Sequence, residues 1–205
     1  MAPAAGIPLE YRPSARNILQ VLDAATAAEW EAGALWYPAA HKIASEIFSD
    51  PATGAGVLAA LSPQRAWAAN VQDARDLAAG RRPRYATRAN LAKAQAILDG
   101  SPWQTVLGDP RTTRRTSRGA KVRNFAACIA DPWDPWAVAI DRHAFDVAVG
   151  RITSDAERER ILARVGVYDR FARTFRAAAR ATGEAPNVIQ AVSWVTWRRL
   201  KGLPE

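Results

Sequence analysis

The sequence contains very little cysteine, few glycines and no long apolar run. Its one cysteine, Cys128, cannot build a disulfide framework, a zinc finger or an iron–sulfur cluster, so we expect a cytoplasmic protein. No apolar stretch reaches membrane-spanning length, and the first residues lack the basic and apolar regions of a secretory signal. With 12 glycines among 205 residues and abundant alanine, the composition favours helices.

Acidic residues are outnumbered by basic ones. The chain carries 28 Lys and Arg against 20 Asp and Glu, which gives a formal net charge of +8. Most of the basic residues are arginines, whose planar guanidinium suits bidentate recognition of phosphate. Nucleic acid is therefore the first partner to consider, although charge alone leaves a generic basic surface equally open. We expect a monomer that binds DNA, with no cofactor, no metal and no membrane association.

The hydrophobic periodicity predicts an all-α protein of about ten helices, with no convincing strand pair. Residues 1–13, which include three of the 13 prolines, are expected to form an extended arm. Residues 14–205 are expected to form a single helical domain, as one compact body or two lobes. The expected helices span about 14–30, 34–49, 65–79, 87–98, 119–129, 141–150 and 167–182, with others before Pro63, from Ser154 and from Pro186.

A lysine and an aspartate lie at the starts of two successive expected helices. Lys121 lies one turn into a helix, and Asp141 follows 20 residues later, directly after an apolar run and two residues before His143. Two helix starts joined by a loop can bring such side chains to one cleft, where they form a nucleophile and acid/base pair. Read singly, each residue also has an ordinary role: Asp141 as a helix N-cap, Lys121 as a surface lysine and His143 as a hydrogen-bonded structural residue.

Two further segments accompany this pair. The apolar run before Pro63 ends in Leu61-Ser62-Pro63-Gln64, and Trp67 follows it. The segment from Arg111 to Arg123 contains six basic residues and no acidic residue. Its ordinary interpretation is a flexible basic loop, and its functional interpretation is a set of phosphate ligands.

Over residues 56–150 the sequence resembles the helix-hairpin-helix DNA glycosylase superfamily, the group of endonuclease III and 8-oxoguanine glycosylase. Gly119-Ala120-Lys121 resembles the end of the family's hairpin, which precedes its catalytic lysine. Val138 to His143 resembles the family's apolar run followed by Asp-x-His, and Leu61-Ser62-Pro63-Gln64 resembles the Leu-Ser-x-Gln of the endonuclease III group.

The sequence departs from the family pattern at the hairpin. The family's Leu-Pro-Gly-Val-Gly is replaced by Arg115-Thr116-Ser117-Arg118-Gly119, so only the second glycine is kept. Arginines and hydroxyls would then replace backbone amides as phosphate ligands. The cluster-binding cysteines of part of the family are also absent.

The resemblance implies an all-α fold of two helical lobes with a cleft between them. It implies an enzyme that flips a modified or damaged base and hydrolyses its N-glycosidic bond, with a lysine-dependent lyase step at the abasic site. Asp141 would support bond cleavage, Lys121 would form a Schiff base at the sugar C1′, His143 would play a supporting role, and Gln64 would fill the gap left by the flipped base. The DNA contacts would be Arg111, Arg114, Arg115, Ser117, Arg118, Gly119 and Arg123. Outside the resemblance, Trp67 is either a core residue or a surface on which a base stacks. Gln190 and Trp194 lie either on a core-facing helix or in the base pocket.

Two alternatives remain open from the sequence. A phage- or prophage-type relative could modify a 5-substituted pyrimidine in DNA without excising it. A non-catalytic DNA-binding module could use the same basic surface with no chemistry at Asp141.

Overall fold

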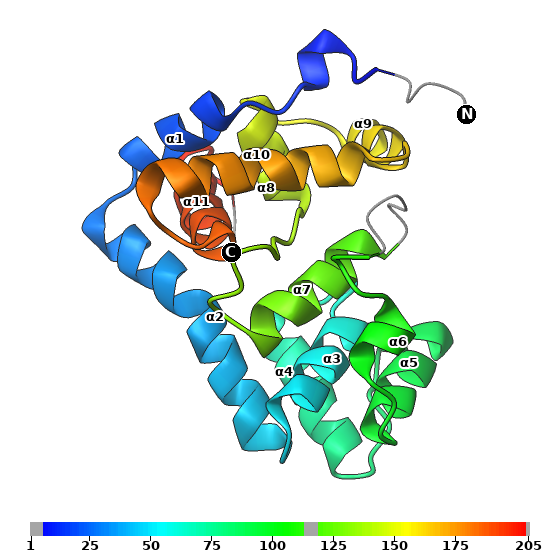
Figure 1. Cartoon of the computed structure of the whole chain (residues 1–205). Coiled ribbons are helices and arrows are strands. Elements are labelled where there is room, and N and C mark those ends of the chain that lie inside the picture. The colour runs from blue at the N-terminus through cyan, green and yellow to red at the C-terminus, as the bar shows by residue number, and fades with distance from the viewer. Residues whose placement is uncertain (1–5, 113–118, 204–205) are drawn as a thin grey trace.

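The protein is all-helical in the ranges that the computed structural model describes, residues 6–112 and 119–203, which contain no strand (Figure 1). The all-α prediction is therefore confirmed. A short 3-10 helix, η1 (Leu9–Tyr11), precedes the α-helices. The α-helices of the described ranges are α1 (Ala15–Asp23), α2 (Ala27–Ile47), α3 (Pro51–Leu61), α4 (Trp67–Ala78), α5 (Arg88–Leu98), α6 (Trp103–Leu107), α7 (Ala120–Ala130), α8 (Arg142–Val149), α9 (Asp155–Leu162), α10 (Val167–Thr182) and α11 (Pro186–Leu200).

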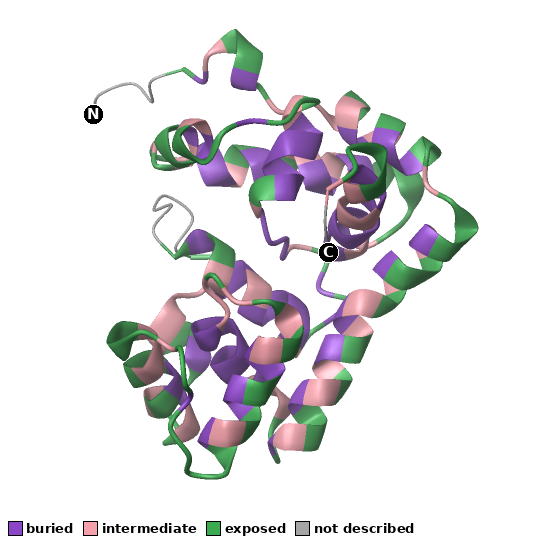
Figure 2. Ribbon diagram, turned by 180° about the vertical axis from the view of Figure 1, so that it is seen from behind, coloured by how far each residue is buried: buried purple, intermediate pink, exposed green. Residues whose placement is uncertain are grey.

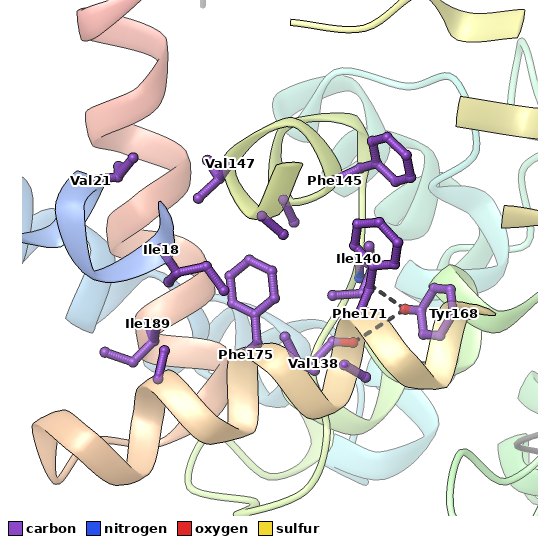
Figure 3. Packing of buried hydrophobic residues seen from close by; sticks show 14 of the residues in the cluster. Ile18, Val21, Val138, Ile140, Phe145, Val147, Tyr168, Phe171, Phe175 and Ile189 are labelled. Carbon is purple, nitrogen blue, oxygen red and sulfur yellow. Dashed lines mark hydrogen bonds between the residues drawn. The ribbon is translucent and has the colours of Figure 1, made fainter. Parts of the chain in front are cut away.

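The buried apolar side chains form two clusters. The terminal cluster joins the two ends of the chain, with side chains from α1, α8, α9, α10 and α11. Phe145 and Phe171 stack at its centre, with ring centroids 4.5 Å apart (Figure 3). The central cluster is built almost entirely from α2 to α7. Figure 2 shows buried residues on the inner faces of both helix groups.

The long helix α2 runs beside both groups of helices (Figure 1). Its Trp30 packs against the terminal cluster, and its Tyr37 belongs to the central cluster. Between them, Gly33 meets α11 so closely that an added Cβ would lie 2.5 Å from the Val192 Cα. Only glycine permits this backbone approach.

Although α2 has 21 residues, no helix of the described ranges has both the length and the apolar character needed to cross a membrane.

The expected extended arm is partly packed onto the domain. Ile7 and Tyr11 are buried in the terminal cluster, and Tyr11 lies on the short helix η1. The Tyr11 hydroxyl donates a hydrogen bond to the Glu157 carboxylate at the start of α9. Residues 7–11 therefore contribute to the core, because they bring two apolar side chains that the terminal helices cover.

The predicted helix over residues 14–30 is wrong, because the chain forms two helices there. Helix α1 ends at Asp23, and α2 begins after Thr26 with a capping box. The Thr26 side chain accepts a hydrogen bond from the Glu29 N–H at 3.3 Å, and the Glu29 carboxylate accepts one from the Thr26 N–H at 2.8 Å. In a continuous helix these two backbone N–H groups would donate to carbonyls of the preceding turn. Here the side chains of Thr26 and Glu29 accept their hydrogen bonds instead, so a new helix begins at this point.

Candidate active site

Asp141 lies at the N-terminus of α8, where its carboxylate caps the helix. Its Oδ1 accepts a hydrogen bond from the Ala144 N–H at 2.8 Å, and the residue is half-buried. The extended segment before it is held by Tyr168, whose hydroxyl accepts from the Ile140 N–H at 2.9 Å and donates to the Val138 carbonyl at 3.2 Å (Figure 3). The N-cap interpretation of Asp141 is therefore confirmed. The cap also fixes the carboxylate in place.

Two buried phenols lie near this carboxylate. Burial raises the pKa of the Tyr37 hydroxyl well above its usual value, and the neighbouring Cys128 and Asp141 raise it further. Burial also raises the pKa of Tyr168, again with contributions from Cys128 and Asp141. Both hydroxyls are therefore neutral donors at ordinary pH. The Tyr37 hydroxyl donates to the Gln190 Oε1 on α11 at 2.8 Å.

Tyr37 also belongs to an aromatic cluster formed by Trp36, Tyr37, Trp67 and Phe125, which come from α2, α4 and α7. The ring centroid of Trp36 lies 4.8 Å from that of Tyr37, 5.2 Å from that of Trp67 and 5.8 Å from that of Phe125. Tyr37 is buried, whereas the other three rings are half-buried. Through Tyr37, the cluster connects Trp67 to Gln190, two residues that the sequence proposes for one base pocket.

Lys121 lies on α7, one helical turn before Phe125, so the two side chains share a face of that helix. Lys121 is exposed, and it forms no ion pair with any carboxylate of the described ranges. The first turns of α7 lie against the segment that leads to Asp141, because the Asn124 Oδ1 accepts a hydrogen bond from the Val138 N–H at 3.5 Å. Lys121 and Asp141 thus lie on two elements in contact, although they do not pair directly.

Gln64 occupies a left-handed backbone conformation that side chains rarely adopt. It is the third residue of a turn from Ser62 to Arg65, closed by a 3.1 Å hydrogen bond from the Arg65 N–H to the Ser62 carbonyl. Pro63 precedes it, and its φ is +60°, which is the arrangement of a type II turn with glutamine where glycine is favoured. The side chain is exposed, three residues before Trp67 of the aromatic cluster. Strained and exposed residues of this kind cluster at functional sites.

The predicted DNA contacts of the basic segment divide into three groups. Arg111 is exposed and pairs with Asp134 at 2.8 Å, and Gly119 caps α7 with a φ of +70°. Arg123 is only 3% exposed, and its burial lowers its pKa, so its role as a surface phosphate ligand is corrected to that of a buried residue. Four predicted contacts lie outside the described residues: Arg114, Arg115, Ser117 and Arg118.

His143 is buried and is the second residue of α8. Its Nε2 accepts a hydrogen bond from the Arg142 Nε at 3.1 Å, while its Nδ1 has no partner among the described residues. Burial is the main cause that lowers its pKa, so the imidazole is neutral at ordinary pH. Its ring meets Trp194 edge-on at 6.1 Å, and Arg198 lies over the same tryptophan at 4.6 Å. Trp194 follows Gln190 by one turn on α11, and its ring contacts His143.

Several residues of this region are not among those proposed from the sequence. Tyr37 and Trp36 on α2, Phe125 on α7 and Tyr168 on α10 join the proposed residues to one another. For Phe125 a signal exists, since it follows Lys121 by four residues and must share its helix face. The other three carry no local signal, because their contacts join helices far apart in the sequence.

In its described ranges the protein is thus all-helical, with a carboxylate fixed at a helix start, an exposed lysine on a helix that contacts the preceding segment, and a half-buried aromatic cluster. The chain belongs to a family of unknown function (DUF7178), whose model matches residues 2–201. Comparisons with curated proteins and with solved structures give no match.

Proposed function

We propose that this protein is a DNA glycosylase-like enzyme of the helix-hairpin-helix type, which extrudes a modified or damaged base and cleaves its N-glycosidic bond. The observation that carries the proposal is the fixed position of Asp141. Its carboxylate is held by the α8 N-terminus, and the Tyr168 hydroxyl immobilises the preceding segment. Lys121 lies on α7, whose Asn124 contacts the segment that leads to Asp141, and this contact supports the proposal.

The chemistry assigned to Asp141 is electrostatic. Breaking the bond between the base and the sugar C1′ develops positive charge on the sugar, and a preorganised carboxylate stabilises that charge. The base departs with the bonding electron pair. Asp141 can then accept a proton from the group that attacks C1′, which is water in simple hydrolysis.

The lysine offers a second route. If the Lys121 amine attacks C1′, the base leaves, the amine loses a proton and the opened sugar forms an imine with the lysine. Elimination of the 3′-phosphate from that imine gives the lyase step. The exposed Lys121 has no carboxylate partner in the described ranges, so its amine is accessible to DNA.

The two apolar clusters correspond in this proposal to two lobes, with the DNA-facing cleft between them. Gln64 would enter the duplex and occupy the space of the extruded base, and the strained turn would project it for that purpose. Trp67 with its half-buried aromatic neighbours would contact the flipped base, because aromatic faces stack on bases. Gln190 is buried and accepts from Tyr37, so it would hold Tyr37 in place instead of contacting the base.

The test is a screen of oligonucleotides that carry different modified bases, with free bases and abasic sites measured as products. The decisive variant is Asp141→Asn, because asparagine also caps helices and only the charge is lost. We expect it to fold normally and to lose base release by at least about 100-fold. Asp50→Asn is the matched control, since Asp50 caps α3 in the same way through Ala52 and Thr53. Undiminished base release by Asp141→Asn would refute the assigned role.

The lyase step has its own test. Borohydride reduces an imine to a stable amine, so incubation of the protein with abasic-site DNA and borohydride should give a covalent adduct. Lys121→Ala should abolish the adduct, whereas Lys42→Ala, at an exposed lysine on α2, should retain it. Failure of the wild-type protein to form the adduct would remove the lyase step while leaving hydrolysis intact.

A second candidate is a DNA-binding module without catalysis. The observation that favours it is the cap itself, because Asp141 has a structural task that needs no chemistry. In that case Asp141→Asn changes neither DNA binding nor any product. Analysis of nucleosides also separates excision from base modification, since modification leaves the base attached to its sugar.

A further inference from the structure

The loop between α4 and α5 carries a concentration of positive charge. From Arg81 to Leu98 the sequence contains five basic residues and no acidic residue. Arg81 pairs with Asp76 at 2.7 Å. In the described part of the chain, three exposed arginines of this segment form no ion pair with a carboxylate: Arg82, Arg84 and Arg88. Their charges are therefore available to an anionic partner.

An exposed tyrosine lies among these arginines. Tyr85 is 61% exposed, and two guanidinium groups lie over its ring, Arg65 at 5.0 Å and Arg84 at 5.2 Å from the centroid. The neighbouring Pro83 is buried and anchors the loop. A ring contacted by two guanidinium groups is unsuited to an apolar protein surface, but it suits a partner that has both aromatic faces and phosphates.

The same loop is tied to the turn that carries Gln64. Arg65 directly follows Gln64, and its Nε bonds the Asp73 carboxylate on α4 at 2.8 Å. Arg65 is thereby fixed along α4, and its guanidinium meets the Tyr85 ring. Through Arg65, the Tyr85 ring and the adjacent Arg84 are therefore linked to the turn that carries Gln64.

We propose that Arg82, Arg84, Tyr85 and Arg88 form a DNA-binding surface, the α4–α5 surface. This surface binds the sugar–phosphate backbone that flanks the position where Gln64 enters the duplex. This inference rests on the proposed function for its choice of DNA. It adds a contact region separate from the basic segment of residues 111–123. Guanidinium groups bind phosphates bidentately, and the tyrosine ring packs on an adjacent sugar or unstacked base.

The experiment compares two double variants that remove equal charge. Arg82→Gln/Arg84→Gln alters the α4–α5 surface, and Arg170→Gln/Arg180→Gln alters two exposed arginines of α10. Affinity for a short fluorescent duplex is measured by anisotropy across a range of salt concentrations, and thermal unfolding checks that both variants fold. Each phosphate contact contributes about 0.9 to the slope of log affinity against log salt.

We expect the α4–α5 variant to lower the salt slope by about 2 and the affinity near 0.1 M salt by roughly tenfold or more. The α10 variant should stay within about twofold of the wild type, because a distant charge acts only through the screened overall field. Tyr85→Ser should weaken binding with an unchanged slope, since stacking releases no counterions.

Equal effects of the two double variants would overturn the inference. If the wild-type protein fails to bind any duplex, both the α4–α5 surface and the proposed function are refuted. If the slopes change as expected but no oligonucleotide releases a base, the surface stands and base excision is refuted.

Discussion

Gln64 offers a perturbation in which stability and function should change in opposite directions. Its φ of +60° places a residue with a side chain in the left-handed region, at a cost of about 1–2 kcal/mol relative to glycine. Replacing it by glycine releases that strain. The more flexible unfolded chain opposes this gain by about 0.4–1 kcal/mol. We therefore expect Gln64→Gly to stabilise the protein by roughly 0.5–1 kcal/mol, which raises Tm by about 1–4 °C for a chain of this size.

Function should decrease in the same variant. If the glutamine side chain fills the gap left by an extruded base, Gln64→Gly should reduce base release from duplex DNA, and it should spare release from single strands, where no gap forms. Gln64→Ala is the matched control. It removes the same polar group and keeps a Cβ in the left-handed conformation, so it should show the same functional loss without the rise in Tm.

Two results would contradict this reasoning separately. A Tm for Gln64→Gly at or below that of the wild type would show that the turn is not strained by its side chain. Wild-type activity on duplex DNA in both variants would show that the side chain does not support base extrusion.

Three further expectations concern the fold. Asp141→Ala should lower the free energy of unfolding by about 1 kcal/mol through loss of the cap, whereas Asp141→Asn should change it by only a few tenths, as thermal unfolding can measure. The ion pair with Arg199 is the main cause that lowers the pKa of Glu29 to about 2, from 4.5. The stabilisation by this ion pair is complete above pH 4.5 and is lost as the pH falls towards 2. Arg199→Gln should therefore reduce the change in the free energy of unfolding between pH 4.5 and 2. An unchanged dependence on pH in that window would contradict the role given to Arg199. Gly33→Ala should lower the free energy of unfolding by about 1–3 kcal/mol, because the added Cβ would overlap the Val192 backbone. Denaturant titration measures this change, and a free energy equal to or above that of the wild type would refute the close contact.

The helix boundaries show which local signals the sequence carries. The prediction of 167–182 matches α10, because Gly183 follows the last turn with a φ of +78° and marks the helix end. The break before α2 was missed, since the residues around it are mostly alanines that favour a helix, and Thr26 with Glu29 is the signal against one. Helix α6 was also missed, because five residues are too few to establish a hydrophobic period.

The candidate site shows the same division between local and distant information. Asp141 could be placed at a helix start from its neighbours alone, because a cap depends on residues within one turn. The burial of Arg123 could not be predicted from a run of basic residues, since it depends on how α7 packs. The contacts of Tyr37 also could not be predicted from the sequence. Its partners Gln190 and Phe125 lie on helices that only the tertiary fold brings to α2.

The close approach of α2 to α11 has a consequence for substrate binding. Gly33 meets Val192, and one turn further along α2 the Tyr37 hydroxyl meets Gln190. The distance between the aromatic cluster and the helices around Asp141 is therefore set by a main-chain contact, which side-chain rotation cannot change. In the proposed function, a nucleotide bound there would meet groups that are already ordered, so little of its binding free energy would be spent on ordering the protein.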